Sequence, residues 1–549
     1  MTRRRAGRLV VALVVVAGGA GGASVLLRTP TPSSAAGPPR FVDETAASGL
    51  AHRYEGDAEY QVGGGVAALD CDGDGRQDLY LAGGAAPAAL FRNRSAVGGA
   101  LRFERLPADA TDLSGVNGAY PIDVDGDGPV DLVVLRTGEP VVLRGRGDCT
   151  FEDATDALGL AGLGGQVTAF SATWEGADAL PTLAIGRYLE LDAEGERTFT
   201  CDDNDLVRPA EGGAAYGPPI PLAPGYCTLS MLFSDWDRSG RRDLRVTNDR
   251  QYYVDGMDQL WRVSPGELPR LYTADDGWVA MQIFGMGIAS QDLTGDGLPE
   301  VYLTSQGDNK LQTLTVDPSK PTFRDIALRR GVTAAQPYAG GDTLPSTAWH
   351  PEFADVNDDG FVDLFVSKGN VGEQVTHASR DPSNLFLGQP DGSFREGAEV
   401  AGIVTFERGR GAALADLNLD GLLDLVLVNY GADAILWRNV GRGTAEAPSA
   451  MGHWIAIDVR QAGANRNAIG AWLEVKIGDL TLHRELTIGG GHAGGQIGSR
   501  HLGLGPATAA EVRITWPDGV TGPWERLEAD GFWILERGAG PVPWSIPED

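Results

Sequence analysis

A short acidic pattern recurs along the chain and has the residue types and spacing of a cation-binding loop. In a chain of this composition, chance would produce on the order of a few hundredths of a match to it. The pattern is Asp-x-[Asp/Asn/Ser/Thr]-x-[Asp/Ser]-Gly-x-x-[Asp/Glu]. It occurs in six segments, which begin at Asp70, Asp123, Asp235, Asp292, Asp355 and Asp416. The repetition therefore indicates one kind of site that the chain builds several times.

The chemistry of this loop is that of a hard cation. Side-chain oxygens at positions 1, 3, 5 and 9, a main-chain carbonyl at position 7 and a glycine turn at position 6 can surround one Ca²⁺ with about six or seven oxygen contacts. Mg²⁺ fits less well because it demands near-ideal octahedral geometry and retains its waters. An EF-hand would need Glu at position 12, where the first two loops have Leu81 and Val134. We therefore expect about six strand-loop-strand calcium sites.

The expected metal positions follow from the pattern, with position 7 contributing its carbonyl oxygen. They are Asp70, Asp72, Asp74, Arg76, Asp78, Asp123, Asp125, Asp127, Pro129, Asp131, Asp235, Asp237, Ser239, Arg241, Asp243, Asp292, Thr294, Asp296, Leu298, Glu300, Asp355, Asn357, Asp359, Phe361, Asp363, Asp416, Asn418, Asp420, Leu422 and Asp424.

Acidic residues dominate the composition of the chain. Of 549 residues, 75 are acidic and 45 are basic, for a formal net charge of -30. This excess argues against nucleic acid or another polyanion as a partner. Twenty of the acidic residues stand at the expected ligand positions, where their carboxylates would repel one another without a cation. Each ion is therefore expected to pin a hairpin, which is a structural rather than a catalytic role.

The loops belong to a longer repeat of β-structure. The interval between Asp123 and Asp235 is twice the usual one, and a degenerate copy aligns there, with Trp174, Gly176, Asp178 and Thr182 at the acidic positions. Including this copy, the units recur about every 58 residues. Short apolar runs flank each loop and are too short and too β-branched for helices. Seven units of about four strands predict an all-β fold with a seven-bladed β-propeller at 41–450, which a strap at 41–54 helps to close.

The N-terminal segment predicts export. Arg3, Arg4, Arg5 and Arg8 precede an uncharged run at 9–27, which is typical of a signal peptide. An uncleaved N-terminal membrane anchor is the alternative for 1–28, and a twin-arginine signal is a weaker one. Residues 29–40 read as a Pro/Ser-rich linker, so folded structure is expected to begin near residue 41. We therefore expect a secreted, periplasmic or cell-surface protein.

Export makes disulfides the expected state of the four cysteines. Cys201 and Cys227 bracket a Pro/Gly-rich loop with few hydrophobic anchors, which favours their pairing. That pair leaves Cys71 with Cys149. Four unpaired buried thiols are the alternative.

A second domain begins where the repeat spacing ends. Alternating apolar runs at 453–459, 471–477, 482–486, 511–516 and 532–536 predict strands. They predict a separate, small antiparallel β-domain at 451–538, followed by a tail at 539–549.

These motifs resemble those of a known family. The loops, with Phe284 and Gly285 in an approach strand, resemble the FG-GAP/VCBS repeats of integrin α-subunit propellers. The opening 41–50, the stretch 346–371 and the C-terminal region resemble the cartilage acidic protein family, whose last domain is ASPIC/UnbV. The ASPIC/UnbV motif residues are Asn465, Arg466, Ile469, Gly470, the run GGGHAGGQ, HLGLG from His501 and WPDG from Trp516; the family has an aromatic residue where His492 stands.

The resemblance implies a secreted or surface calcium-binding propeller with a small β-domain. We expect it to act as a binding or adhesion module for an extracellular protein or glycan, with Ca²⁺ as its cofactor. Residues 191–226 are the candidate partner-binding loop, since they form the longest break in the repeat. Neither nucleic acid nor, apart from an N-terminal anchor, a membrane is an expected partner.

The alternative function is a secreted carbohydrate-active enzyme built on the propeller. The motifs give it no positive support, because G-x-S-x-G, H-E-x-x-H and a Walker loop are all absent from the sequence. Such an enzyme would need His350, Glu352, His377 and Arg380 to share a central funnel. A second polar set would have to converge in the C-terminal domain. It consists of His492, His501, Arg466, Arg484 and Glu485.

Overall fold

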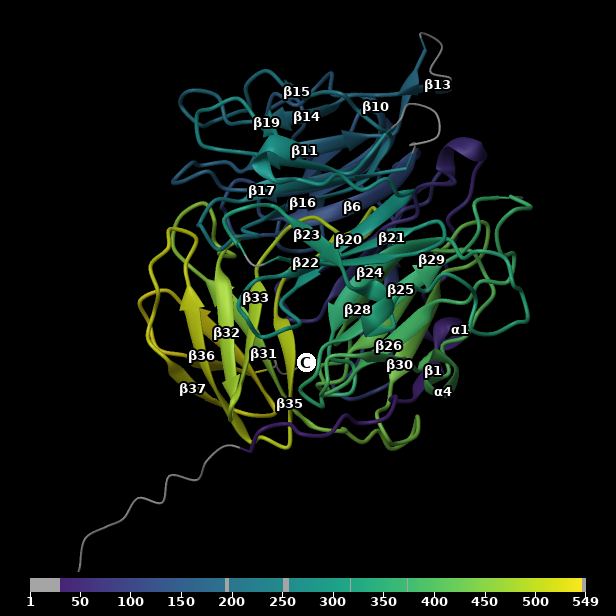
Figure 1. The fold of residues 1–549 in the computed structure, drawn as a ribbon, viewed down its shortest axis with the longest axis vertical. Coiled ribbons are helices and arrows are strands. Elements are labelled where there is room, and N and C mark those ends of the chain that lie inside the picture. Colours follow the sequence, from purple (N-terminus) through teal and green to yellow (C-terminus); the bar gives the residue numbers. More distant parts are fainter. Residues whose placement is uncertain (1–29, 193–196, 250–255, 316, 373, 546–549) are drawn as a thin grey trace, which may run out of the picture.

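The computed structural model describes residues 30–192, 197–249, 256–315, 317–372 and 374–545. Within these residues the regular secondary structure is almost entirely β-strand, arranged as a propeller-like series of small sheets and a C-terminal domain (Figure 1). The predicted signal peptide or anchor at 1–28 lies outside the described residues. Among the residues described, no helix is long and apolar enough to cross a membrane.

A unit of four successive strands recurs through the repeat region, as the spacing predicts. The second strands are buried along their whole length, apart from the end of β7, because both of their faces pack against neighbouring sheets. The first two units consist of β2 (Val66–Leu69), β3 (Asp78–Leu81), β4 (Ala89–Asn93) and β5 (Phe103–Leu106), then β6 (Val116–Ile122), β7 (Asp131–Gly138), β8 (Val141–Gly145) and β9 (Phe151–Asp153).

Three further units have the same strand order. They are β16 (Thr228–Ser234), β17 (Asp243–Asn248), β18 (Gln259–Arg262) and β19 (Arg270–Leu271); β20 (Gly285–Gln291), β21 (Glu300–Ser305), β22 (Lys310–Leu314) and β23 (Phe323–Asp325); and β24 (Ala348–Ala354), β25 (Asp363–Lys368), β26 (Asn384–Gly388) and β27 (Phe394–Glu396).

The last unit takes its outer strand from the start of the chain. It contains β28 (Gly409–Ala415), β29 (Asp424–Asn429) and β30 (Ile435–Asn439), and β1 (Phe41–Asp43) pairs antiparallel with β30. Phe41 lies opposite Asn439 in this register. The strand expected within 41–54 is therefore present, and folded structure begins where the sequence predicts.

Short helical turns follow several outer strands. The helices are α1 (Thr45–Ser48), α3 (Ala327–Arg330) and α4 (Ala398–Ala401), and the 3₁₀ turns are η1 (Ala58–Tyr60) and η2 (Ala274–Asp276). Each of the three helices ends at a glycine with positive φ, a conformation that glycine adopts without strain.

The degenerate third unit replaces the acidic loop with an ion pair. Its strands are β10 (Gly165–Thr173), β11 (Thr182–Arg187), β14 (Asn204–Val207) and β15 (Ile220–Leu222). In the turn between β10 and β11, Glu175 accepts hydrogen bonds from Thr182 and Arg208 at 2.7 Å each. The positive charge of Arg208 therefore neutralises the carboxylate of Glu175 in this turn.

The candidate loop at 191–226 is only partly an insertion. Its second half supplies β14 and β15, the third and fourth strands of the third unit. The extra element is a hairpin of β12 (Leu189–Leu191) and β13 (Arg197–Cys201). The sequence interval is long because a hairpin precedes the third strand.

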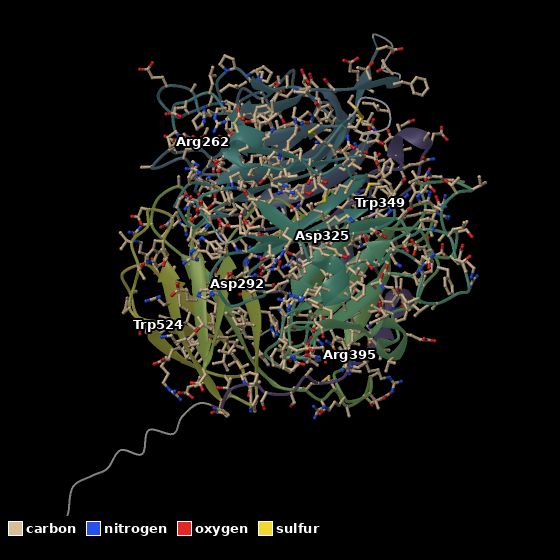
Figure 2. All side chains as sticks on the ribbon, in the orientation of Figure 1. Arg262, Asp292, Asp325, Trp349, Arg395 and Trp524 are labelled. Carbon is tan, nitrogen blue, oxygen red and sulfur yellow. A yellow bond between two sulfur atoms is a disulfide. The ribbon has the colours of Figure 1, made fainter. Side chains whose placement is uncertain are left out.

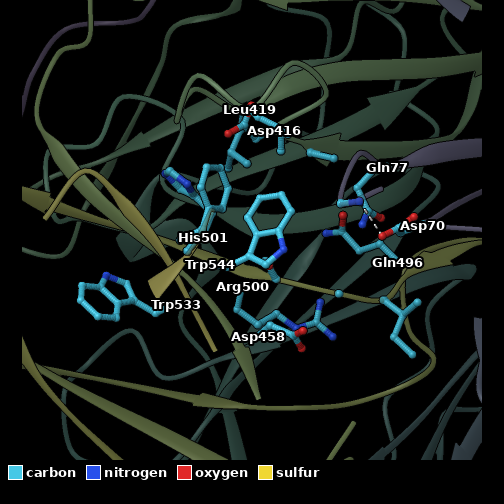
Figure 3. Close-up of a pocket in the computed structure, with 18 of the residues that line it drawn as sticks. Asp70, Gln77, Asp416, Leu419, Asp458, Gln496, Arg500, His501, Trp533 and Trp544 are labelled. Carbon is cyan, nitrogen blue, oxygen red and sulfur yellow. Dashed lines mark hydrogen bonds between the residues drawn. The ribbon is translucent and has the colours of Figure 1, made fainter. Parts of the chain in front are cut away.

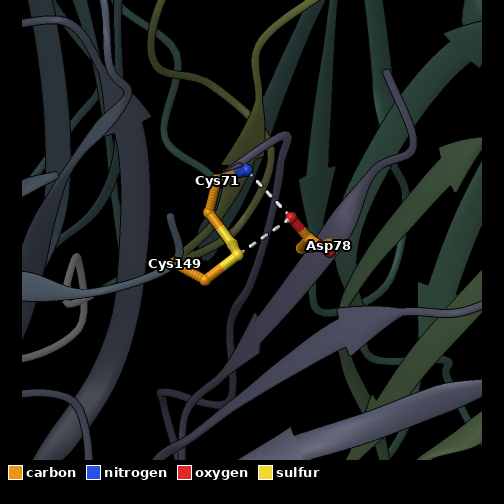
Figure 4. Close-up of side chains that lie close together, drawn as sticks. All are labelled: Cys71, Asp78 and Cys149. Atoms are coloured by element: carbon orange, nitrogen blue, oxygen red, sulfur yellow. Dashed lines mark hydrogen bonds between the residues drawn. A yellow bond between two sulfur atoms is a disulfide. The ribbon is translucent and has the colours of Figure 1, made fainter. Parts of the chain in front are cut away.

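Both predicted disulfides are formed. Cys201 pairs with Cys227, and Cys71 pairs with Cys149. The second bridge joins the first acidic loop to the turn between β8 and β9 in the next unit, where the backbone N–H of Cys149 also donates to the Cys71 carbonyl at 3.0 Å. Asp78 lies against this bridge and accepts the backbone N–H of Cys71 (Figure 4).

The C-terminal domain is a sandwich of two four-stranded sheets. One contains β35 (Arg500–Gly505), β31 (His453–Arg460), β38 (Gly531–Glu536) and β39 (Val542–Trp544), and the other contains β33 (Leu480–Glu485), β32 (Trp472–Ile477), β36 (Ala509–Thr515) and β37 (Glu525–Glu528). A cluster of buried aliphatic side chains fills the space between the sheets.

Two expectations for this domain are wrong. The domain is not wholly antiparallel, because β31 and β38 run parallel. The predicted tail is also part of the fold, since β39 pairs with β38. The parallel register places the apolar side of β38 on the core that β31 already lines, which an alternating sequence pattern cannot distinguish from antiparallel pairing.

The linker at 30–40 contains no helix or strand, but it is held in place at several points. The backbone N–H of Ala36 donates to Asp359 at 2.6 Å, and Thr31 accepts the N–H of Asp479 at 2.8 Å. The segment therefore lies against both the fifth loop and the C-terminal domain.

The C-terminal domain is also not separate from the repeat units. Its glycine-rich segment 488–496 leaves the sandwich and lies against the first strands of successive units. Within it, β34 (Gly495–Gln496) pairs parallel with β2. Further bridges join the segment to β6, β10, β16 and β20, through Ala119, Ala172, Leu232 and Ile288.

Glycine is required on both sides of this contact. Gly65 and Gly118 face the carbonyl of Ala493 so closely that a Cβ on either would overlap its oxygen. A Cβ on Gly494 would overlap the carbonyl of Val66 in the same way. Backbone therefore packs on backbone, which explains the glycines at these positions.

We expect Gly118→Ala to lower the free energy of unfolding by about 1–3 kcal/mol, because the new methyl group forces the segment out of place. Gly164→Ala is the matched control, since its Cβ would meet nothing closer than 3.5 Å. Urea unfolding of both variants measures the effect. Equal stability of the two variants would contradict the close packing of this segment.

Candidate functional site

The six acidic loops occupy equivalent positions in their units. Each joins the first strand of a unit to the second. The first carboxylate of each loop accepts the backbone N–H of the glycine at position 6; for example, Asp70 bonds Gly75 and Asp416 bonds Gly421, both at 2.8 Å. These six glycines have φ between 83° and 108°, so the turn needs a residue that adopts left-handed backbone without strain.

The side chains at positions 3 and 5 bend back on the same turn. Asp72 accepts the N–H of Asp74 at 3.3 Å, and Asp74 accepts that of Arg76 at 2.8 Å. The same bond from position 5 to position 7 recurs at Asp359 and Asp420. These bonds hold the carboxylates on the inside of each loop.

The acid at position 9 has a second role that sequence reasoning missed. Asp131 accepts the N–H of Val124 with one oxygen and that of Gly145 with the other, both at 2.8 Å. Asp363 does the same with Val356 and Gly388. This carboxylate therefore ties the loop to the third strand of its unit. The recurrence of an acid directly at the start of each second strand was the available signal.

The carboxylates are buried close to one another, and their electrostatics fit a cation. Burial, with the adjacent carboxylates, raises the pKa of Asp70 to about 6 and that of Asp131 and Asp416 to about 7. Burial and Asp359 likewise raise the pKa of Asp355 well above its usual range. Such shifts mean that negative charge is unfavourable there unless a positive charge compensates it.

The loops differ in which nearby groups compensate the negative charge of their carboxylates. In the first two, three carboxylates each place ligand oxygens within 4.8 Å of one another. Four loops also have a basic partner: Arg92 pairs with Asp72, Arg144 with Asp125 at 2.7 Å, Arg241 with Asp243 at 2.8 Å, and His483 with Asp292 at 2.8 Å.

Within the part of the chain that the structure describes, the fifth and sixth loops lack an arginine or lysine partner, and the fifth has only the contact of His501 with Asp358 at 2.6 Å. Among the described residues, no Lys or Arg forms an ion pair with their carboxylates. Asp363 and Asp424 are completely buried and their pKa values are raised well above the usual range by burial. Side-chain carboxylate and amide oxygens are ligands that Ca²⁺ prefers, so these two loops are best suited to hold it.

A third acidic group beside the first loop does not fit a metal. Asp78 lies close to Cys71 and Cys149, but both sulfurs belong to a disulfide (Figure 4). A disulfide sulfur is not the thiolate that binds metals.

The C-terminal domain rests on the face that carries all six loops. Glu485 accepts the backbone N–H of Asp235 at 2.9 Å, and His483 contacts Asp292, which Figure 2 labels at the boundary between the repeat units and the C-terminal domain. His501 contacts Asp358 in the fifth loop at 2.6 Å, and Arg466 lies 3.9 Å from Asp123 in the second.

Two tryptophans cover the remaining loops. Trp544 lies so close to Gly75 of the first loop that a side chain there would overlap its ring, and Trp454 lies in the same way on Gly421 of the sixth. The docking of the C-terminal domain and the conformation of the loops are therefore coupled.

The residues singled out for catalysis do not gather in one pocket. His350 and Glu352 lie 3.4 Å apart beneath the glycine-rich segment. His377 instead belongs to a half-buried turn, where its carbonyl accepts a hydrogen bond from Asn370, and Arg380 stacks on Phe406 at 3.8 Å. These four residues therefore do not share the central funnel that the enzyme hypothesis requires.

The second polar set is also dispersed. Arg466 lies at the second loop and His501 at the fifth, whereas His492 belongs to the glycine-rich segment and its ring contacts the carbonyl of Met286. Arg484 lines one cavity with Glu485 and another with His501.

Comparison with known families agrees with this architecture. Residues 70–134 match the FG-GAP-like repeat family, and residues 461–542 match the ASPIC and UnbV family. Cartilage acidic protein 1 of Mus musculus is 26% identical over 222 residues, covering 37% of this chain and 31% of that protein. The Homo sapiens protein is 26% identical over 247 residues, covering 43% and 33%. The resemblance expected from the sequence is confirmed, although the match spans about a third of the relatives' own length.

Solved structures of similar chains include an Agrocybe aegerita lectin that recognises non-reducing terminal N-acetylglucosamine. It has 16% identity and a TM-score of 0.38, covering 66% of this chain and 86% of that one. A calcium structure of the Trichoderma reesei Carbohydrate-Active Enzymes Family AA12 protein has 9% identity and a TM-score of 0.34, covering 76% and 99%. At such scores neither likeness bears on ligand or activity.

His492 makes the glycine-rich segment sensitive to acid. It is fully buried, with its ring centroid 5.0 Å from that of Trp349, and its backbone N–H donates to His350 at 3.1 Å. Burial lowers the pKa of His492 to about 3. An unfolded histidine gains its proton below about pH 6.5, so the folded state loses stability as pH falls from there towards 3.

We expect His492→Phe to reduce this acid sensitivity by about 1.4 kcal/mol for each pH unit below 6.5. Chemical unfolding of both proteins at pH 7.5, 6.0 and 5.0, in one calcium concentration, gives the slopes. The slope is the readout, because the larger ring shifts stability equally at every pH. Parallel curves would contradict a neutral, buried His492.

Proposed function

We propose that this protein is an exported, calcium-binding, seven-bladed β-propeller that acts as an extracellular or cell-surface binding module for a protein or glycan. The observation that carries the proposal is the buried carboxylate cluster of the fifth and sixth loops, with which no Lys or Arg of the described residues forms an ion pair. Each of the six loops is proposed to hold one Ca²⁺ through the positions given above. The ion supplies the positive charge that lets the carboxylates stay ionised where they are buried.

The strand contacts support a closed ring. The first strands β2, β6, β10, β16, β20, β24 and β28 lie beside one another in this order, and β28 also lies beside β2. The pairing of β1 with β30 joins the two ends of the repeat region. A ring closed in this way leaves no exposed sheet edge between the first and last units.

The cysteines support export. Two disulfides are formed among the described residues, and such bonds persist in oxidising compartments. Calcium binding points the same way, because extracellular modules bind it weakly, at about 10⁻⁴ to 10⁻³ M, and need the concentrations found outside the cell.

The partner is proposed to bind on the face opposite the loops. The C-terminal domain occupies the loop face, whereas the β12–β13 hairpin follows a second strand and so lies at the other end of its sheet. Phe199 of this hairpin is 84% exposed, and Cys201 fixes its base through the disulfide to Cys227. An exposed aromatic residue on an anchored hairpin is suited to recognition.

Calorimetric titration with calcium, together with thermal unfolding in chelator and in millimolar Ca²⁺, tests the proposal. We expect saturable binding of about six ions and a large rise in melting temperature. Each site contributes about 2.7 kcal/mol when free calcium is about 100 times its dissociation constant. A chain that binds no calcium and gains no stability from it would contradict the proposal.

Asp420→Asn is the sharpest single variant. Asn418 donates a side-chain N–H to Asp420 at 3.1 Å, and the amide oxygen of the new asparagine can accept the same bond. We expect the variant to lose about one ion and part of its stability in calcium, while its stability in chelator is unchanged or higher. Asp275→Asn, at an exposed position, should match the unaltered protein. An equal loss of stability with and without calcium would assign Asp420 a purely structural role.

A further inference from the structure

A cavity of about 200 Å³ lies between the repeat units and the C-terminal domain. The first and sixth loops form one side of it, and β33, β35, β38 and β39 form the other. Figure 3 shows Arg500, Gln496, Trp533 and Trp544 around this space. A second cavity of about 120 Å³ under the glycine-rich segment shares Glu352, Arg484, Gln496 and Arg500 with it.

Two arginines face this cavity without a direct hydrogen bond or ion pair to a described residue, although the charges of Glu352 and Asp458 act on them from farther away. Arg484 on β33 and Arg500 on β35 lie deep in the interior, yet each keeps some accessible surface, which must face the cavities that they line. No hydrogen bond or ion pair of either guanidinium occurs within the described part of the chain. Burial lowers the pKa of Arg484, and burial with the charge of Arg484 lowers that of Arg500 to about 10.

Four carboxylates line the cavity: Asp70 and Asp416 belong to the first and sixth loops, and the other two make hydrogen bonds or ion pairs elsewhere. Glu352 accepts from Gln496 at 2.6 Å with one oxygen and from the backbone N–H of Leu414 at 3.1 Å with the other. Asp458 pairs with Arg460 at 2.6 Å. Burying two guanidinium groups without a hydrogen-bonded counter-charge costs free energy, and this arrangement is typical of a site that binds an anion.

The other residues of the cavity wall indicate which kind of anion the cavity could bind. Phe532, Trp533 and Trp544 line it, with the rings of Phe532 and Trp544 packed edge to face at 5.4 Å. Gln77, Asp458 and Gln496 add hydrogen-bonding groups. Aromatic surface beside amide and carboxylate groups suits a ring that carries hydroxyl groups, while an arginine fork suits a carboxylate or sulfate.

We infer that this cavity binds one acidic sugar unit, with Arg484 and Arg500 holding its carboxylate or sulfate and the aromatic wall packing on its ring. The inference adds a ligand class to the proposed binding module and rests on it, because two calcium loops form part of the wall. The anionic sugar would contact both domains at once and therefore strengthen their association.

Calorimetry of the calcium-saturated full chain with four probes tests the inference. The probes are D-glucuronate, D-glucose 6-sulfate, D-glucose and acetate. We expect at least one of the two acidic sugars to bind saturably and at least ten times more tightly than glucose or acetate, and the stronger of the two identifies the anionic group. Failure of both acidic sugars to bind, or acetate binding as tightly as they do, would overturn the inference.

Variants separate a ligand site from a structural role. Arg500→Gln and Arg484→Gln should each weaken binding at least tenfold, while the melting temperature without sugar stays the same or rises, because an unpaired buried charge is removed. Arg526→Gln, at an exposed position, is the control. Unchanged sugar affinity in both cavity variants, or a fall in melting temperature in both, would assign the arginines to the fold alone. The calcium-dependent melting temperature, read without sugar in the same samples, tests the calcium proposal separately.

Discussion

Mutual repulsion among buried carboxylates is the constraint on which the rest of this structure depends. Six loops bring their acids to one face of the chain, and their hydrogen bonds use backbone N–H groups, which hold the carboxylates in place without neutralising them. An arginine compensates some of the charge in three loops, a histidine contacts an acid in two others, and Arg208 pairs with Glu175 in the degenerate third unit. Calcium is the simplest source of the remaining positive charge.

The same face receives the C-terminal domain, which links charge compensation to the arrangement of the domains. His483 and Glu485 contact the fourth and third loops, and the strand that holds them leads directly into the glycine-rich segment. That segment packs backbone against backbone on the first strands, so small displacements of the strands cannot be absorbed by side chains. We propose the opposite face as the site for a partner, while the junction itself encloses the arginine-lined cavity.

Sequence reasoning recovers the local features of the fold and misses those that depend on distant contacts. The six loops, the degenerate copy, both disulfides and the five expected C-terminal strands were predictable because each has a pattern within a few residues or a fixed repeat. The role of β1 as an outer strand also had a signal, since Phe41 begins the same Phe-x-acid stretch as Phe151, Phe323 and Phe394. The path of segment 488–496 had none, because a glycine run is locally a loop and its partners are hundreds of residues away. Arg484 and Arg500 were equally hidden, since a cavity-facing arginine and a solvent-facing one have the same strand pattern.

Amide hydrogen exchange tests the central claim, that calcium on the loops holds the C-terminal domain in place. The measurement follows residues 488–496 in the full chain, first in millimolar Ca²⁺ and then in chelator, since local opening reports on this coupling. The account predicts that protection of this segment falls in chelator together with that of the loops, although no calcium ligand lies within it. Full protection of 488–496 in chelator, while the loops lose theirs, would contradict it.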